Sequence, residues 1–328
     1  MHPAFSVVFL TTLIGAGQGL FLALFTVESY AAFGLLPAQS DAFYALGSAI
    51  AMILLVLGLI ASFFHLGRPE RAWRSATQWR TSWLSREVLV LPAFMGATFC
   101  YGLAHWTGFN PVLATLPSGA PINITAVLGV IGTVLAFALY ICTGMIYACL
   151  RFLREWHTPL TVINYILLGG ASGFSLAAAL AVTEAPLVMP FLTGWALIIT
   201  FLGLVGRAAT LLRNARLKPK SSLQTAIGIK HPKIVQKSQG MMGGAFNTRE
   251  FFHGQSRAVL RSVKWFFLVT VFLIPLALLG VSLSASPDSL AGLLALAFAV
   301  QYLGLLAERW FFFAQANHPQ NLYYQSVS

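Results

Sequence analysis

Eight long apolar runs dominate this sequence and leave few folds open to it. A helix that crosses a lipid bilayer needs about 20 predominantly apolar residues, and each run reaches that length. Inside lipid every backbone amide must find its partner within the protein, so such runs form helices. The predicted fold class is therefore all-α, a polytopic membrane bundle of eight transmembrane helices. The predicted spans are 5–33, 43–65, 87–107, 122–149, 159–182, 187–212, 263–284 and 289–314.

The composition supports a membrane protein and argues against a nucleic-acid-binding one. Hydrophobic residues make up 58% of the chain and charged residues only 9%, whereas soluble proteins carry about 25% charged residues. Spanning helices need neighbours that cover their polar groups, so residues 1–328 are predicted to form a single integral membrane domain. The net charge of +11 is expected to face lipid headgroups or an acidic partner, and no nucleic-acid partner is expected.

The charges are sorted between the two ends of the predicted bundle. With eight spans, all 20 lysines and arginines fall at the end that carries both termini and the connections near 66–86, 150–158 and 213–262. The other end carries only acids. Positive residues in short loops mark the cytoplasmic side of a membrane. Both termini are therefore predicted to be cytoplasmic.

One connection is much longer than the others, residues 213–262. Its first half is basic, and its second half mixes glycines with the aromatic residues Phe246, Phe251 and Phe252. A connection of this length is commonly functional or disordered. We predict a long basic cytoplasmic loop, either a docking surface for a partner protein or a flexible segment on anionic lipid.

The spans contain few polar groups, and this limits the possible functions. Glycines surround Gln18 in the first span and recur at 169, 170 and 173 in the fifth, which predicts close helix packing and an interhelical hydrogen bond from Gln18. We identified no ionisable residue near the middle of a span, which argues against an ion pump or an ion-coupled transporter. No internal repeat supports a permease.

Metal and haem sites find little support in the sequence. The three cysteines form no C-x-x-C motif, so neither a zinc site nor an iron–sulfur cluster is expected. The histidines do not form a pair at matched depth within the spans, although His157 and His65 fall at the same end. No haem and no metal are therefore expected in this chain.

The polar stretch from His65 to Glu87 is the candidate site. It begins where the second span ends and finishes where the third begins, so His65 and Glu87 lie at one membrane face. Quinone reduction requires hydrogen-bond donors, positive potential and a protonatable group, which His65, Arg71 and Glu87 can supply. Arg68, Arg74 and Trp83 are further candidates, although arginines and tryptophans are also expected at any interface of this kind.

The same stretch resembles a known family. His65-Leu66-Gly67, Pro69 and Arg71-Ala72, followed by Ser82, Leu84-Ser85 and Glu87, are similar to the loop between the second and third helices of the membrane anchor subunits of dimethyl sulfoxide (DMSO) reductase-type molybdoenzymes. That family belongs to the wider polysulfide- and nitrite-reductase anchor superfamily. The long loop also resembles a narrower branch, the anchors of cytoplasmic sulfite dehydrogenases that reduce quinone.

The resemblance implies a function and a set of partners. It implies a membrane anchor that binds ubiquinone or menaquinone through residues matching His65, Gly67, Arg71, Ser85 and Glu87. An iron–sulfur subunit and a molybdopterin catalytic subunit would dock on the anchor, which would lie in the bacterial inner membrane. The best-known branch holds these subunits on the periplasmic side, whereas the charges here place them in the cytoplasm.

Three functions remain open from the sequence. The chain is predicted to pass electrons from sulfite oxidation to the quinone pool, as a subunit without a catalytic residue of its own. The alternative is a quinol-oxidising anchor of a reductase for DMSO, polysulfide or another oxyanion, because a quinone site works in both directions. The third possibility is a small-solute permease.

Overall fold

The computed structural model describes residues 1–328 except 65, 116–118, 120, 220, 239–249 and 324–328. Eight helical segments in it are long and apolar enough to cross a membrane, which confirms the predicted fold class. These segments are α1 (Phe5–Ala32), α2 (Asp41–Phe63), α3 (Trp83–Thr107), α4 (Ile124–Ala148), α5 (Pro159–Glu184), η2 (Pro186–Val188) with α6 (Met189–Ala215), α9 (Arg257–Leu268) with η4 (Val269–Leu273) and α10 (Ile274–Ser282), and α11 (Pro287–Ala314).

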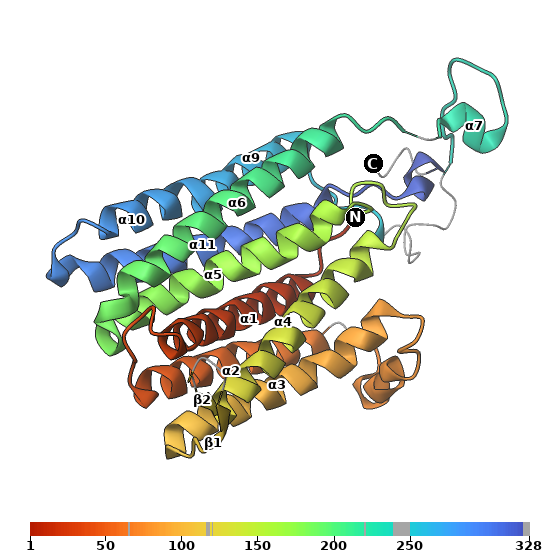
Figure 1. Ribbon diagram of the computed structural model, residues 1–328. Coiled ribbons are helices and arrows are strands. Elements are labelled where there is room, and N and C mark those ends of the chain that lie inside the picture. Colours follow the sequence, from red (N-terminus) through yellow and green to blue (C-terminus); the bar gives the residue numbers. More distant parts are fainter. Residues whose placement is uncertain (65, 116–118, 120, 220, 239–249, 324–328) are drawn as a thin grey trace.

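Helix α1 is the centre of the bundle. It packs against α2, α4, α5 and α11 and is the most buried of the eight spans (Figure 1). Its approach to α5 depends on glycine, because a Cβ at Gly19 would lie 2.3 Å from the carbonyl oxygen of Gly169. Gln18 donates a hydrogen bond from Nε2 to the Ala136 carbonyl at 2.8 Å. Both predictions made for this helix, close packing and an interhelical bond, are confirmed.

The seventh span contains one turn of π-helix, η4, where it faces α11. Gln301 of α11 is fully buried there and donates hydrogen bonds to the Val271 carbonyl and the Thr200 hydroxyl, while it accepts one from Ser175. A π-turn widens the helix and re-aims its carbonyls. Gln301 therefore ties four elements together through a polar group whose hydrogen bonds are satisfied.

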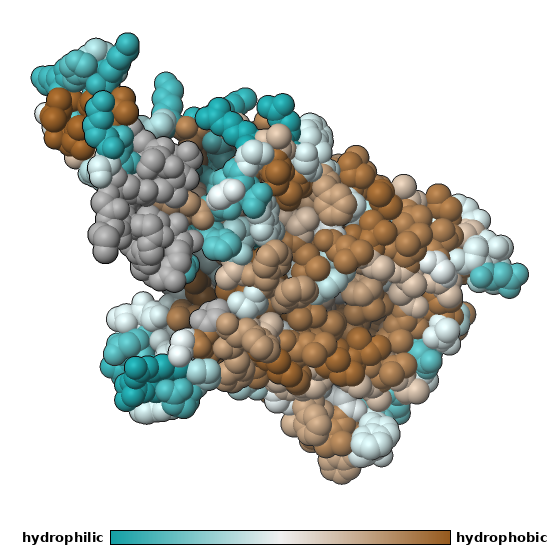
Figure 2. Space-filling view, turned by 180° about the vertical axis from the view of Figure 1, so that it is seen from behind, coloured by the Kyte–Doolittle hydropathy of each residue, from teal (hydrophilic) through white to brown (hydrophobic). Residues whose placement is uncertain are grey.

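The connections gather at two ends. One end, which we name the basic end, carries the N-terminus, the short helix α7 (Leu223–Ile227), η1 (Pro69–Ala76) and η5 (Pro319–Tyr323) (Figure 1). The opposite end carries a small hairpin of β1 (Val112–Thr115) and β2 (Pro121–Asn123). Figure 2 shows apolar surface over the helices and polar surface gathered toward the basic end.

The long connection is shorter than predicted. Helix α6 continues to Ala215, and α9 begins at Arg257, where the Ser256 hydroxyl accepts a hydrogen bond from the Val259 amide. The helices therefore extend past the apolar runs, because backbone hydrogen bonding and capping do not end where apolar side chains end. Phe246, one of the aromatic residues noted in this connection, lies outside the described residues.

Two arginines assigned to connections lie inside the bundle instead, and that assignment was wrong. Arg207 on α6 is 1% exposed and Arg309 on α11 is 4% exposed. Glu308, beside Arg309, is also buried at 1%. These groups lie in the halves of their spans nearer the basic end, so the prediction of no ionisable residue near mid-span is not overturned. They are buried because partnered charges can be accommodated between helices.

Candidate functional site

The connection between α2 and α3 forms an exposed basic loop. Arg68 precedes η1, while Arg71 and Arg74 lie on it, and all three are exposed. Arg71 Nε lies 3.9 Å from the Glu70 carboxylate, and the Arg74 guanidinium lies 5.6 Å from the Trp73 ring centre. Gly67 is also exposed, with open space where a Cβ would be. This loop therefore presents positive charge to whatever covers the basic end.

The start of α3 is held by local contacts. The Ser82 hydroxyl accepts a hydrogen bond from the amide of Ser85, a buried residue, and so caps the helix. Arg86 donates to the carbonyls of Trp79 and Arg80, and its guanidinium lies 4.2 Å from the ring centre of Trp83. Arg86 thus fastens the loop to the helix, a role that the sequence did not indicate.

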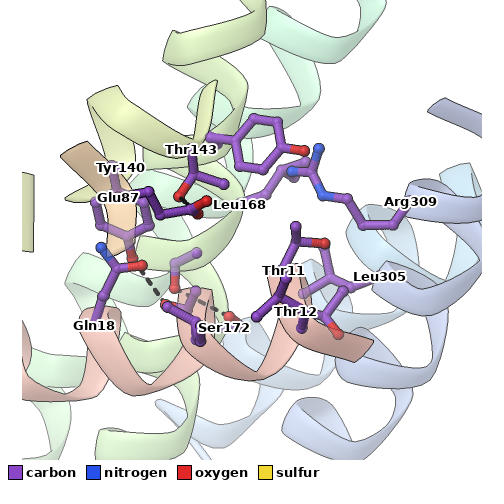
Figure 3. A pocket seen from close by; sticks show the side chains of 15 residues that line it. Thr11, Thr12, Gln18, Glu87, Tyr140, Thr143, Leu168, Ser172, Leu305 and Arg309 are labelled. Carbon is purple, nitrogen blue, oxygen red and sulfur yellow. Dashed lines mark hydrogen bonds between the residues drawn. The ribbon is translucent and has the colours of Figure 1, made fainter. Parts of the chain in front are cut away.

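Glu87, one turn after the first residue of α3, points into the bundle. Its carboxylate accepts a hydrogen bond from the Thr143 hydroxyl on α4. Both residues line a narrow cavity of about 20 Å³ between α1, α3, α4, α5 and α11 (Figure 3). Tyr140 also lines it, but its hydroxyl is occupied by the Gly15 carbonyl at 2.8 Å. Since a water needs roughly 10–15 Å³, the cavity has room for about one water molecule.

The wall opposite α4 carries a buried ionic cluster. Arg309 lines the cavity, and its guanidinium lies 3.8 Å from the ring centre of Tyr165 on α5. Its Nε is 3.4 Å from Glu308, whose other oxygen is 2.7 Å from Nε of Arg207. Two guanidinium groups therefore share one carboxylate, which leaves an excess of one positive charge among these three residues.

The structure separates the predicted site residues into two groups. Arg68, Arg71 and Arg74 remain in the exposed loop, whereas Glu87 faces the interior of the bundle. His65 lies outside the described residues, so its distance from Glu87 stays untested. Nδ1 of His157, considered as a neighbour of His65, lies 2.6 Å from the Ala148 carbonyl.

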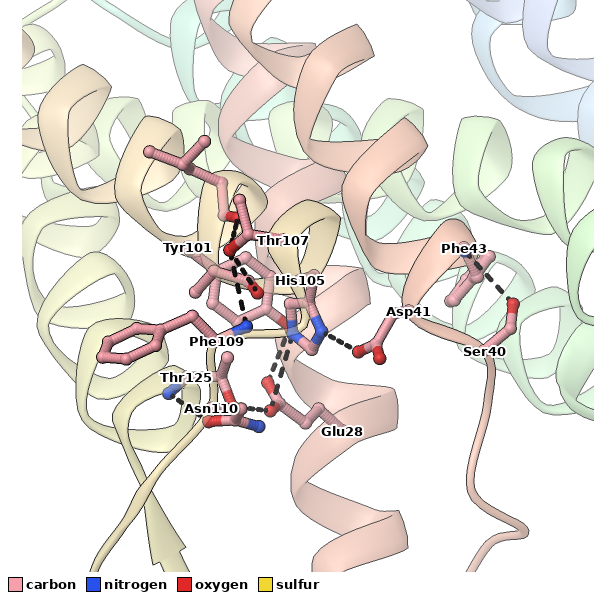
Figure 4. Close-up of polar contacts among 12 residues, drawn as sticks. Glu28, Ser40, Asp41, Phe43, Tyr101, His105, Thr107, Phe109, Asn110 and Thr125 are labelled. Atoms are coloured by element: carbon pink, nitrogen blue, oxygen red, sulfur yellow. Dashed lines mark hydrogen bonds and ion pairs between the residues drawn. The ribbon is translucent and has the colours of Figure 1, made fainter.

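A second polar cluster lies at the opposite end. His105 on α3 is buried, with Nδ1 2.7 Å from Asp41 and Nε2 3.7 Å from Glu28 (Figure 4). Glu28 also accepts hydrogen bonds from Tyr101 and Thr125. These contacts join the ends of four spans, α1 to α4, and every carboxylate in them has a protein partner. We interpret this cluster as a structural clamp.

The sequence contained a signal for the ionic cluster that the charge count obscured. Glu308 and Arg309 stand inside an apolar run, as does Arg207 in its own span. Charges in such positions indicate an interior face with partners. Thr143 and Tyr165 had no such signal, because hydroxyl side chains are common in membrane helices and only the packing of α4 and α5 brings them to Glu87.

Comparison with known proteins defines the class of this chain. The DMSO reductase anchor subunit (DmsC) family matches residues 1–313, and the chain belongs to that family. It is thus a membrane anchor subunit of a DMSO reductase-type complex.

The chain is also similar to a relative over its whole length. This relative is a subunit of the sulfite dehydrogenase of Allochromatium vinosum, and it is 57% identical over 328 residues, which cover all of both chains. The resemblance stated from the motif between His65 and Glu87 is confirmed by both comparisons.

Proposed function

We propose that this chain is the quinone-binding membrane anchor of a sulfite dehydrogenase. It would receive electrons from sulfite oxidised in the cytoplasm and pass them to the quinone pool of a bacterial inner membrane. The observation that carries this proposal is the position of Glu87, an acid turned into a membrane-embedded polar cavity at the start of the helix that follows the basic loop. The similarity to a sulfite dehydrogenase subunit supports sulfite as the substrate of the complex.

The basic end is the proposed docking surface for the partner subunits. An iron–sulfur subunit would contact the loops there and connect this chain to a molybdopterin catalytic subunit. Exposed arginines of the α2–α3 loop attract an acidic protein surface and steer its approach. Ala226 accepts a hydrogen bond from Tyr323 and Phe251 from Asn321, so α7 and the end of the long loop are joined to η5. Parts of the long loop thus have fixed positions at this end.

Quinone suits this region as a substrate because its reduction couples electrons to protons. Quinone gains two electrons and two protons to become quinol, and the electrons come from the two-electron oxidation of sulfite with water to sulfate. A carboxyl group can carry the protons, whereas a guanidinium stays charged and can supply only potential. Glu87 is therefore proposed as the proton donor, with His65 as a hydrogen-bond donor and Arg71 as a source of positive potential.

The size of the cavity decides where the ring of quinone would lie. A cavity of about 20 Å³ accepts a water and not an aromatic ring. The ring would therefore bind on the loop side of Glu87, near Gly67, Ser85 and Trp83, with its tail in lipid. Glu87 would then separate the ring from the interior cavity and exchange protons with both.

Replacing Glu87 with glutamine tests this proposal. Glu87→Gln keeps the size of the side chain and its acceptor for Thr143 but cannot carry a proton. We expect the sulfite-driven reduction of a soluble quinone analogue by the purified complex to fall at least about 100-fold, the usual contribution of a positioned acid. Oxidation of sulfite with an artificial acceptor that takes electrons from the partner subunits should remain unchanged.

The matched control is Glu70→Gln, which removes an exposed carboxylate from the neighbouring loop. It should leave quinone reduction close to that of the native complex. If the Glu87→Gln complex reduced quinone as fast as the native complex, Glu87 would not be the proton donor. The main support for the proposed site would then be removed.

A further inference from the structure

The buried hydroxyl of Tyr165 is unusual in this bundle. Tyr165 is 4% exposed and lines the cavity beside Glu87, yet its hydroxyl makes no hydrogen bond of acceptable geometry within the described part of the chain. An unsatisfied buried hydroxyl costs about 1–3 kcal/mol. Tyr140, which lines the same cavity, avoids this cost by donating to a backbone carbonyl. The Tyr147 hydroxyl and the Arg309 guanidinium lie near it, but without a well-formed bond to either the Tyr165 hydroxyl can take a further partner that is not a protein group.

A water molecule meets the requirements of this position. The cavity volume of about 20 Å³ exceeds the roughly 10–15 Å³ that one water needs, and buried waters bind two to four polar groups. Tyr165, Glu87 and Arg309 all line it. They offer a hydroxyl, a carboxylate and guanidinium donors, which together can satisfy one water.

The charges around the cavity allow Glu87 to release its proton as well as to hold it. Arg207, Glu308 and Arg309 carry one excess positive charge, and an uncompensated charge inside a membrane is costly. A carboxylate at Glu87, across the cavity, would lower this cost, whereas burial in the bundle favours the protonated carboxyl, so Glu87 can both release and hold a proton. The charged and titratable groups that face Glu87 from the surrounding helices are Arg86, Tyr140, Cys142, Tyr147, Tyr165, Glu308 and Arg309.

We propose that this cavity is a water site through which Glu87 gains and loses its proton, with Tyr165 as the residue that positions the water. The proposal rests on the proposed function, in which Glu87 supplies protons to quinone. In each exchange the Glu87 carboxyl passes one proton to the water through one oxygen and takes another from it through the other, so no charged water is left in the cavity. Tyr165 acts through the water and does not contact the quinone.

The first test observes Glu87 directly, without quinone turnover. In infrared spectra of the purified complex, the carbonyl band of a protonated carboxyl that is missing in Glu87→Gln identifies this residue. Tyr165→Phe removes only the hydroxyl and keeps the ring that packs against Tyr147, Phe312 and the Arg309 guanidinium, so the complex should fold normally. We expect it to shift that band and to slow its hydrogen–deuterium exchange at least about tenfold, as expected when a proton relay is broken.

The second test separates a water site from a quinone contact. Tyr165→Phe should lower kcat for quinone reduction at least about tenfold and leave the KM for quinone unchanged. The control is Tyr30→Phe, in a ring that packs on Phe191 near the opposite end of α1, and it should change neither quantity.

Two results would overturn the water site. An increase in KM with unchanged kcat would mean that Tyr165 touches the quinone, and an unchanged infrared band would mean that Glu87 does not exchange its proton through the cavity. Failure of the proposed function gives a different pattern. In that case the band would respond to Tyr165→Phe, while Glu87→Gln would leave quinone reduction unchanged.

Discussion

Single residues in this chain owe their chemistry to the partners that the fold brings to them. Glu87 and Glu70 are both acids near the α2–α3 loop, but one faces a membrane-embedded cavity and the other is exposed beside Arg71. Exposed pairs of this kind contribute about 0–1 kcal/mol. Of these two acids, Glu87 has the surroundings that the proposed proton donor needs.

His318 at the basic end provides a prediction at this scale. Its ring stacks on Phe251 with centres 3.7 Å apart. Burial, with a further contribution from the positive N-terminal amine, lowers the pKa of the His318 imidazole below its ordinary value. The His318 ring that stacks on Phe251 therefore binds fewer protons than the same ring released into solvent. The stacking of His318 on Phe251 should therefore weaken as the pH falls through the ordinary histidine pKa of about 6.5.

Hydrogen exchange of Pro319–Tyr323 measures this effect. We expect faster exchange at about pH 5.5 than at about pH 7.5, after correction for the intrinsic rates. His318→Phe keeps an aromatic ring but cannot be protonated, so the difference between the two pH values should shrink. The part that remains belongs to the N-terminal amine, whose pKa burial lowers to about 6 and which donates to the Ala316 carbonyl. If the native chain showed the same corrected exchange at both pH values, protonation of His318 would not control how this segment packs on Phe251.

At the scale of elements, the contact between α1 and α5 is the most demanding. A Cβ at Gly173 would lie 2.1 Å from a backbone carbon of Gly19, so neither helix can carry a side chain at this crossing. The close approach brings Gly15, Gly169 and Ser172 to the wall of the cavity. The cavity therefore exists because these helices can approach so closely.

Gly19→Ala is expected to destabilise this crossing. The added methyl group must push the helices apart, and overpacking of this kind costs about 1–3 kcal/mol. Unfolding of the detergent-solubilised complex by heat or by a denaturing detergent should show the loss. The matched control is Gly292→Ala in α11, where the added methyl group meets open space, and it should be neutral or stabilising by about 0.5–1 kcal/mol. Equal behaviour of the two variants would contradict this view of the crossing.

At the scale of the whole molecule, the protein has one basic end and one acidic end. The basic end carries the N-terminus, η5 and the α2–α3 loop, whereas the opposite end carries the clamp of Glu28, Asp41 and His105. Two arginines proved to be buried, yet both still lie in the halves of their helices nearer the basic end. The basic end is proposed to face the cytoplasm.

Cysteine labelling of intact cells tests this orientation. In a background without the three native cysteines, Ala38→Cys should react with a membrane-impermeant maleimide, because the connection between α1 and α2 is exposed at the opposite end. Ser221→Cys, in the connection after α6, should react only after the membrane is opened. The reverse pattern would place the docking surface outside the cytoplasm.

The sequence alone determined the number of spans, the all-α class and the family. Apolar runs of sufficient length can only be helices in lipid, and the motif from His65 to Glu87 is read without knowledge of packing. The helix that contains Gln18 was also predicted to pack closely for a reason visible in its glycines.

Only the tertiary structure decided which groups meet inside the bundle. It turned Glu87 away from the arginine loop and toward Thr143, and it brought Tyr165 and Arg309 to the same cavity from helices far away in sequence. It also showed that Arg207 and Arg309 are interior charges. The physical reason is that the apolar pattern determines which segments become spanning helices. The rotation of each helix about its axis, and the choice of helices it packs against, depend on side-chain packing.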